Sequence, residues 1–166
     1  MLAGLSNRAE IRDHARRFLG ELGVREPPID ADSCLACRDL RVDDCPLDEL
    51  LDLRDNDNGP APARSKILAV LDVRGRRIWL KGKLHPHQQK FGKLHEIGHD
   101  ILPWQREFLY VCSIFDLPEA IRSEWEREAN AFAVECLFLS GRFMAEAGGL
   151  PFGLKTAKYL ADQYGA

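Results

Sequence analysis

Two histidines and a glutamate, spaced as His95-Glu96-Ile97-Gly98-His99, are the residues of this sequence best suited to metal chemistry. In a helix of about 3.6 residues per turn, side chains four positions apart leave the same face, so both imidazoles could bind one tetrahedral zinc ion. Glu96 lies about a quarter turn away. It could take a proton from a zinc-bound water molecule, whose pKa zinc lowers to about 7. The alternative interpretation is a surface helix that carries two histidines without a metal.

A catalytic zinc site needs a third protein ligand and an open fourth position. Residues 118–139 form a second helical pattern, in which Glu126 and Asn130 lie four residues apart at the border of the apolar stripe. We therefore predict Glu126 as the third ligand and Asn130 as the acceptor for the free N–H of a metal-bound histidine. Glu124 and Glu128 are expected to face solvent. The alternative for Glu126 is an ion pair with a neighbouring arginine.

The elements that must position these residues follow from hydrophobic periodicity and turn signals. Helices are predicted over residues 6–22, 31–37, 86–102, 118–139 and 154–164. A short strand or turn is predicted over 40–47, and a β-hairpin over 66–73 and 77–81. Residues 54–62 and 103–117 are predicted to be connections. Two strands followed by two long helices indicate an α+β fold, a single domain of residues 1–166 whose small hairpin packs against both site helices.

The composition limits the class of protein. A chain of 166 residues can bury a core without disulfide bonds. A formal net charge of -3 argues against a general nucleic-acid binder, which would usually be basic. We see no signal peptide and no apolar run that could cross a bilayer, so the sequence predicts a soluble cytoplasmic protein. The five cysteines are an odd count and are predicted to be reduced thiols.

Two further groups of residues were considered for chemistry. Cys34-Leu-Ala-Cys37, with Cys45 nearby, could belong to a structural zinc or redox site. A single Cys-x-x-Cys pair without a fourth ligand instead favours buried, unreactive thiols. Tyr110 and Arg142 are candidates for a donor that steadies an oxyanion, and the sequence alone places neither of them at the site.

Two blocks of the sequence resemble the ImmA/IrrE family of bacterial and phage metallopeptidases: Phe91-Gly-Lys-Leu-His-Glu-Ile-Gly-His-Asp-Ile-Leu102 and Glu126-Arg-Glu-Ala-Asn-Ala-Phe-Ala133. The resemblance extends over most of residues 8–164 and is most specific in these blocks. It implies a zincin-like (thermolysin-like) peptidase core. It also implies site roles that match those above: zinc on His95, His99 and Glu126, Glu96 as the catalytic base, and Asn130 beside a ligand.

The resemblance also implies a substrate. Members of the family cut or inactivate helix-turn-helix repressors, which turns on stress-response or mobile-element genes. Leu139-Ser140-Gly141 stands where family members usually have a proline after the second helix. No helix-turn-helix domain accompanies this chain, so the target repressor is expected to be a separate protein.

The sequence thus predicts a zinc-dependent metalloendopeptidase that cleaves a helix-turn-helix repressor, without a direct nucleic-acid or membrane partner. One alternative is a non-proteolytic, zinc-binding regulatory domain of the same fold that binds its partner without cleaving it. The other is a metal-free interaction domain in which the histidines are structural.

Overall fold

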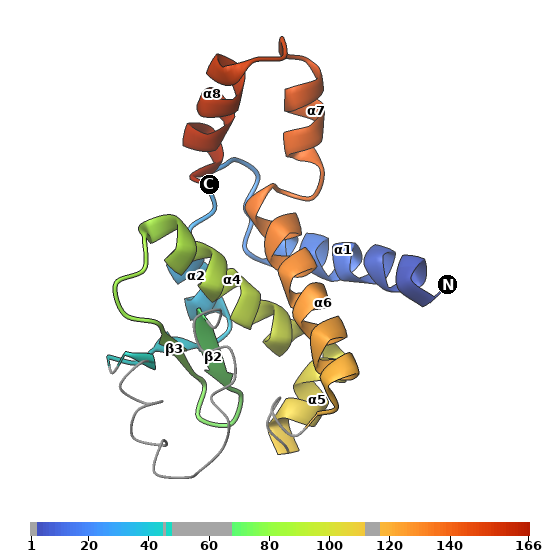
Figure 1. Cartoon of the computed structure of the whole chain (residues 1–166), viewed down its shortest axis with the longest axis vertical. Helices are drawn as coiled ribbons and strands as arrows, with labels where there is room; N and C mark the ends of the chain where they lie inside the picture. Colours follow the sequence, from blue (N-terminus) through green and yellow to red (C-terminus); the bar gives the residue numbers. More distant parts are fainter. Residues whose placement is uncertain (1–2, 45, 48–67, 112–116) are drawn as a thin grey trace.

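The computed structural model describes residues 3–44, 46–47, 68–111 and 117–166, and they form a mostly helical α+β fold (Figure 1). The elements in chain order are α1 (Ala3–Glu21), α2 (Ala31–Cys37), β1 (Arg41–Val42), β2 (Ala69–Asp72), β3 (Arg77–Leu80), α4 (Pro86–Ile101), α5 (Pro103–Val111), α6 (Glu119–Leu137), α7 (Arg142–Gly148) and α8 (Leu154–Tyr164). The sheet has the order β1-β3-β2, with β1 parallel and β2 antiparallel to β3. The predicted α+β class is confirmed. The prediction that the hairpin packs against both long helices is wrong, because β2 and β3 pack mainly on α4, on the side away from α6. Among the helices described, we find none that could span a membrane.

The predicted elements are present with shifted ends, and two helices were missed. The expected connection at 103–117 contains α5, because a proline that ends one helix fits the first turn of the next. The short helix α7 follows α6 after a turn at Gly141, whose φ of 100° suits glycine. The N-terminal helix begins at Ala3 instead of near residue 6. The predicted loop at 54–62 lies outside the described residues.

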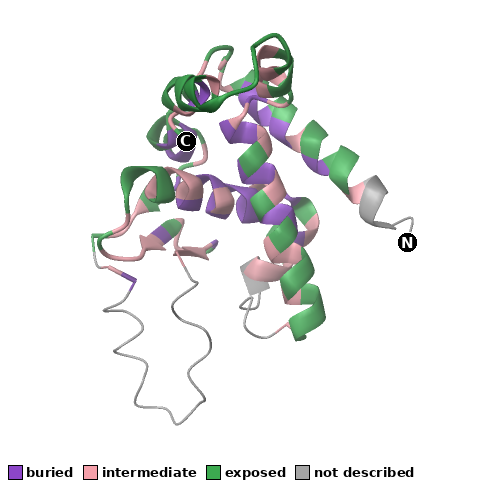
Figure 2. Ribbon diagram, turned by 45° about the horizontal axis from the view of Figure 1, so that its top comes forward, coloured by how far each residue is buried: buried purple, intermediate pink, exposed green. Residues whose placement is uncertain are grey.

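Helix α4 lies at the centre of the fold, with the sheet on one side and α6 on the other (Figure 1). It contacts α2, α5, α6, β2 and β3, while α1 packs against α6. Figure 2 shows the buried faces of α1, α4 and α6 turned toward one another. The core between them contains fully buried apolar side chains, among them Ile11, Phe18, Leu94, Ile97, Phe132 and Cys136. Helix α4, which carries both histidines, is therefore held on several sides.

Helices α4 and α6 approach each other most tightly at Gly98. A Cβ atom built on Gly98 would lie 3.2 Å from Phe132 Cδ1 and 3.3 Å from both Ala129 Cα and the Ala129 carbonyl oxygen. These distances are too short for comfortable packing, and the opposing atoms are backbone or a ring in the core. Gly98 thus permits the short separation that brings side chains of α6 next to those of α4.

A buried carboxylate at the end of α4 ties three other segments to this helix. The fully buried Asp100 carboxylate accepts hydrogen bonds from Arg38 at the end of α2 and from Arg76 in the β2–β3 turn, and Arg106 of α5 lies 3.6 Å away. Burial alone would raise the pKa of Asp100, but the hydrogen bonds and charges of Arg76 and Arg38 lower it below its usual value. The charged form of Asp100 therefore stabilises the fold.

Replacing Gly98 with alanine tests the close approach of the helices. We expect Gly98→Ala to lower the free energy of unfolding by about 1–3 kcal/mol, because overpacking outweighs the better helix propensity of alanine. Gly20→Ala in α1 is the matched control, because a Cβ there meets nothing within 4 Å. Urea unfolding of both variants checks this, and equal stability of Gly98→Ala and wild type would contradict the packing described.

Replacing Asp100 with asparagine tests the buried ion cluster. We expect a loss of about 3 kcal/mol at neutral pH, because the arginines lose their anionic partner. The folded-state pKa of Asp100 is lowered, so its stabilisation is complete above the unfolded pKa and is lost as pH falls through the folded value. The stability difference between wild type and Asp100→Asn should therefore shrink in acid. A difference that stays constant down to acid unfolding would contradict this assignment.

Candidate metal centre

The N-terminus of α4 is capped, which fixes the helix that carries the two histidines. The Gln88 side chain accepts a hydrogen bond from the His85 N–H (3.1 Å), and the His85 ring accepts one from the His87 N–H (3.3 Å). Pro86 occupies the first turn, where its lack of an N–H costs nothing. The helix then continues without interruption to Ile101, so residues 95 and 99 share one face.

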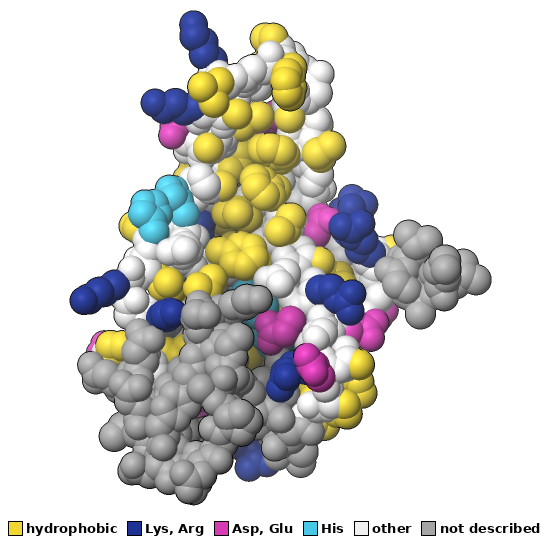
Figure 3. All heavy atoms as spheres, in the orientation of Figure 1, with side chains coloured by type: hydrophobic (Ala, Val, Ile, Leu, Met, Phe, Trp, Pro, Cys, Tyr) yellow, Lys and Arg dark blue, Asp and Glu magenta, His cyan; other side chains and the backbone are white. Residues whose placement is uncertain are grey.

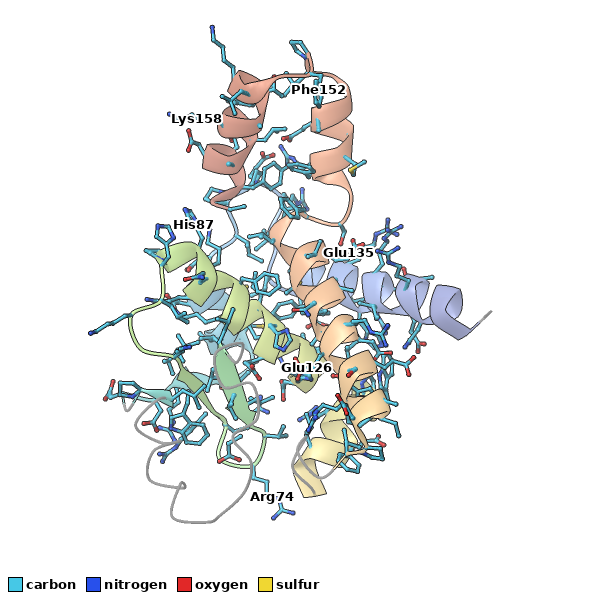
Figure 4. The ribbon with its side chains drawn as sticks, viewed as in Figure 1. Arg74, His87, Glu126, Glu135, Phe152 and Lys158 are labelled. Atoms are coloured by element: carbon cyan, nitrogen blue, oxygen red, sulfur yellow. The ribbon has the colours of Figure 1, made fainter. Side chains whose placement is uncertain are left out.

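The structure brings together the three side chains predicted as metal ligands. The Nε2 atoms of His95 and His99 are 3.1 Å apart, and Glu126 places one carboxylate oxygen 3.2 Å from His95 Nε2 and the other 3.8 Å from His99 Nε2. Their ligand atoms all lie within 4.8 Å of one another, so they could hold one metal ion. We call these three residues the His–His–Glu cluster. Figure 4 shows Glu126 projecting from α6 toward α4.

One side of the His–His–Glu cluster is open to solvent and the other is closed. The Glu126 side chain is 44% exposed, whereas that of His99 is 3% exposed. A metal ion bound here would have the buried His99 on its inner side. Water or substrate could reach it from the exposed side, where Glu126 lies. Three protein ligands with one accessible position are typical of catalytic zinc sites, since structural sites fill all four.

The surroundings favour the metal-binding forms of these side chains. Burial, aided by the charge of His95, lowers the pKa of His99 to about 4, so its imidazole is neutral at pH 7. Burial acts to raise the pKa of Glu126, but the hydrogen bond and charge of His95 lower it overall. Burial likewise opposes protonation of His95, yet the bond to Glu126 raises the pKa of His95 overall. A cation in the cluster would take the place of that proton.

Glu96 is buried next to the cluster. Its side chain leaves α4 about a quarter turn from His95, and the residue is 4% exposed. Burial raises the pKa of Glu96 to about 7; the charge of His95 opposes this rise and that of Glu126 adds to it. A carboxyl group with a pKa near neutrality can both accept and return a proton at pH 7, as a general base must.

Asn130 lies against His95 as the sequence predicts for a supporting residue. Its Oδ1 is 3.0 Å from His95 Nδ1. Since a carbonyl oxygen only accepts, this contact assigns the proton to Nδ1 and leaves the Nε2 lone pair facing the cluster. The spacing of four residues on α6 puts Glu126 and Asn130 on the same side of that helix, next to His95.

The support for His99 was not predicted. The Gln105 Oε1 accepts from His99 Nδ1 (2.6 Å), and the Gln105 Nε2 donates to Glu128 (2.6 Å). Glu128 also accepts from Trp104 Nε1 (2.8 Å) and from the Asn7 side chain in α1. Because Glu128 accepts the amide N–H of Gln105, the amide oxygen must face His99. The chain from Glu128 through Gln105 therefore directs the Nε2 lone pair of His99 into the cluster.

The expectation that Glu128 faces solvent is wrong. Glu128 is 6% exposed because α5 and α1 both pack on its side of α6 and supply its donors. Gln105 is completely buried. Its position six residues after His99 fits no helical repeat, and only the turn between α4 and α5 brings it back. Nothing in its type or spacing marks it in the sequence.

None of the remaining candidates that the structure describes belongs to the His–His–Glu cluster. Cys34 is buried, which raises the pKa of its thiol to about 12, while Cys37 is exposed; Cys45 lies outside the described residues. In the described part of the chain, the His–His–Glu cluster is the group of metal-binding type that we find. Arg142 pairs with Glu26 and Glu146, so it is used at the α6–α7 junction. The side chain of Tyr110 is among those not described.

No match to this chain was found among protein-family models, curated proteins or solved structures. The functional interpretation therefore rests on the residues of the site and on their geometry.

Substitution of Gln105 or Glu128 tests the hydrogen-bond chain behind His99. We expect Gln105→Leu to weaken zinc binding about 10–100-fold, because His99 loses the acceptor that orients it, and Glu128→Gln to weaken it less. Competition with a chromophoric chelator measures the affinity. Glu124→Gln, an exposed change on the same helix, is the control and should bind zinc like wild type. Unchanged zinc affinity in a folded Gln105→Leu variant would show that the chain does not support the metal centre.

Proposed function

We propose that this chain is a zinc-dependent metalloendopeptidase of zincin-like fold. The observation that carries the proposal is the convergence of His95 Nε2, His99 Nε2 and the Glu126 carboxylate beside the buried Glu96. These groups come from two helices that the fold holds together at Gly98. Two long helices crossing beside a small sheet are also the arrangement expected of a zincin-like core.

The donor set fits zinc better than the common hard cations. Two imidazole nitrogens and one carboxylate oxygen are ligands of catalytic zinc sites. Magnesium and calcium prefer sites made of oxygen atoms, and the cluster offers them a single carboxylate. His95 Nδ1 donates to Asn130 Oδ1 and His99 Nδ1 donates to Gln105 Oε1, and these hydrogen bonds fix both imidazoles in the form that presents Nε2.

Each group at the site would have a separate role in peptide hydrolysis. When bound, zinc would supply Lewis acidity for the carbonyl and for a water molecule. Glu96 accepts the proton of the attacking water and then passes it to the nitrogen of the leaving amine. The new C–O bond forms first, and the peptide C–N bond then breaks as the leaving nitrogen takes up the proton. The open side at Glu126 admits the polypeptide, while the buried side at His99 keeps the ligands fixed.

The substrate class follows from the sequence resemblance. The blocks at 91–102 and 126–133 are similar to those of the ImmA/IrrE family, so we propose a helix-turn-helix repressor as the protein that is cut. The proposed place of action is the cytoplasm, where such repressors bind DNA. Cleavage would derepress stress-response or mobile-element genes. The acidic chain acts on the protein and needs no nucleic-acid contact of its own.

Glu96→Gln separates the peptidase from a non-proteolytic regulator. We expect the variant to keep stoichiometric zinc while its cleavage rate falls by at least about 100-fold, because it lacks the general base. The measurement compares new protein N-termini by mass spectrometry in cells that make wild type, Glu96→Gln or the control Glu124→Gln. New N-termini in a helix-turn-helix repressor should depend on Glu96. A zinc-loaded wild type that yields the same termini as Glu96→Gln would contradict the proposal and favour a partner-binding role.

A further inference from the structure

Apolar side chains lead away from the His–His–Glu cluster along both helices that form it. On α6, Glu126 and Asn130 are followed at the same spacing of four by Val134, and Phe138 caps the end of the helix, so these residues form a row that turns slowly around α6. Val134 is 43% exposed. On α4, Phe91 precedes His95 by four residues, and the centroids of the two rings are 6.4 Å apart. The surface therefore changes from polar at the cluster to apolar toward the C-terminal end of α6 and the N-terminal end of α4.

This apolar surface continues onto the helical hairpin formed by α7 and α8. The rings of Phe138 and Phe143 lie 4.6 Å apart, which joins α6 to α7. Figure 3 shows hydrophobic side chains in an unbroken run from the hairpin down over α6 and α4 toward the site. Phe152, at the far end of the hairpin in Figure 4, is 109% exposed. We call Phe91, Val134, Phe138, Phe143 and Phe152 the apolar strip.

The hairpin is fixed in place although much of its apolar surface is uncovered. Arg142 forms ion pairs with Glu26, in the segment after α1, and with Glu146 of α7. The Tyr164 hydroxyl of α8 donates a hydrogen bond to Glu146 (3.0 Å). No residue of α7 is buried. The inner face of the hairpin also packs on the core through the buried Leu160 and Tyr164. Its outer face leaves large apolar side chains exposed, among them Met144, Phe152, Leu154 and Tyr159. Exposed apolar patches of this kind mark interaction sites.

The position of the apolar strip indicates what binds it. Because the strip starts at the cluster, a polypeptide with one bond at the metal centre would lay its neighbouring residues across Val134 and Phe138. One edge of the strip carries cationic or ionisable side chains, Lys158 and His87, which Figure 4 places on the same side of the molecule. Such an edge attracts acidic groups beside an apolar segment.

We propose that the apolar strip docks an apolar, acid-flanked segment of the substrate polypeptide next to the bond that is cut. This inference rests on the proposed peptidase function and specifies which part of a substrate the enzyme recognises. Docking on the strip beside the cluster would select the substrate, while the cluster and Glu96 do the chemistry. A second copy of this chain is the competing occupant of the strip.

Binding of labelled peptides to the zinc-loaded Glu96→Gln protein tests the proposal without hydrolysis. The probe is a fluorescein-labelled peptide of about 15 residues, with a Leu/Phe-rich centre between glutamates, and its twin has serine at the apolar positions. We expect the apolar peptide to bind at least about tenfold more tightly than its twin. Adding Val134→Ser or Phe152→Ser should weaken binding severalfold. Ile121→Ser is the matched control, because Ile121 is similarly exposed (42%) but lies at the other end of α6.

The outcomes separate this inference from the peptidase proposal. Equal binding of both peptides, or binding that the strip variants leave unchanged, would overturn the docking surface even if repressor cleavage is observed. Apolar-peptide binding that depends on Val134 and Phe152 would support the docking surface even if Glu96-dependent cleavage is absent. Light scattering tests whether a second copy of this chain occupies the strip. A dimer that Val134→Ser or Phe152→Ser converts to a monomer, with peptide binding unchanged, would assign the strip to a second copy.

Discussion

Helices α4 and α6 pack so closely at Gly98 that even a Cβ atom there would meet Ala129 and Phe132 at 3.2–3.3 Å. This close packing brings the Glu126 carboxylate within 3.8 Å of both histidine Nε2 atoms. A Cβ at position 98 would lie 3.2–3.3 Å from atoms of Ala129 and Phe132, so α6, which carries Glu126, would have to shift by a few tenths of an ångström to receive it. The geometry of the cluster thus depends on the packing of Ala129 and Phe132 against the backbone of α4. The His–His–Glu cluster and the hydrophobic core are parts of one arrangement.

Hydrogen bonds behind the cluster connect it to the rest of the fold. His99 reaches α5 through Gln105, and Gln105 reaches α6 and α1 through Glu128 and Asn7. The next residue along α4, Asp100, binds arginines from α2 and from the β2–β3 turn. Each of these contacts restricts the orientation of the end of α4. Metal sites with such support hold their ligands in the productive geometry before the ion arrives.

The sequence predicted the parts of the structure that repeat locally. The helices over 31–37 and 154–164 have the predicted bounds, and α4 and α6 differ by one or two residues at their ends. Ligand spacing within one helix follows from the helical repeat, so the proximity of His95 and His99 could be expected. The shorter α5 and α7 have too few turns to show a clear apolar period, and a proline or a glycine sets their start.

Contacts that cross between elements could not be predicted in the same way. Glu128 is buried because α1 and α5 pack beside it, and no local pattern in α6 reports that packing. Gln105 meets His99 only because the chain turns back after Leu102. The three arginines around Asp100 come from distant segments, and their meeting point is set by tertiary structure. A single sequence shows the types and spacings of the candidate ligands. The side chains that hold them in place come from distant segments, and only the folded structure identifies them.

X-ray absorption at the zinc edge, on the zinc-loaded chain, tests the central claim most directly. We expect one zinc per chain, with two imidazole nitrogens and the remaining ligands oxygen, at about 2.0–2.2 Å and without sulfur. In a Glu126→Ala variant the two imidazoles should remain while the oxygen shell and the affinity change. Sulfur scattering at about 2.3 Å would assign the ion to cysteines. That result, or a folded chain that takes up no zinc, would contradict a metal centre at His95, His99 and Glu126.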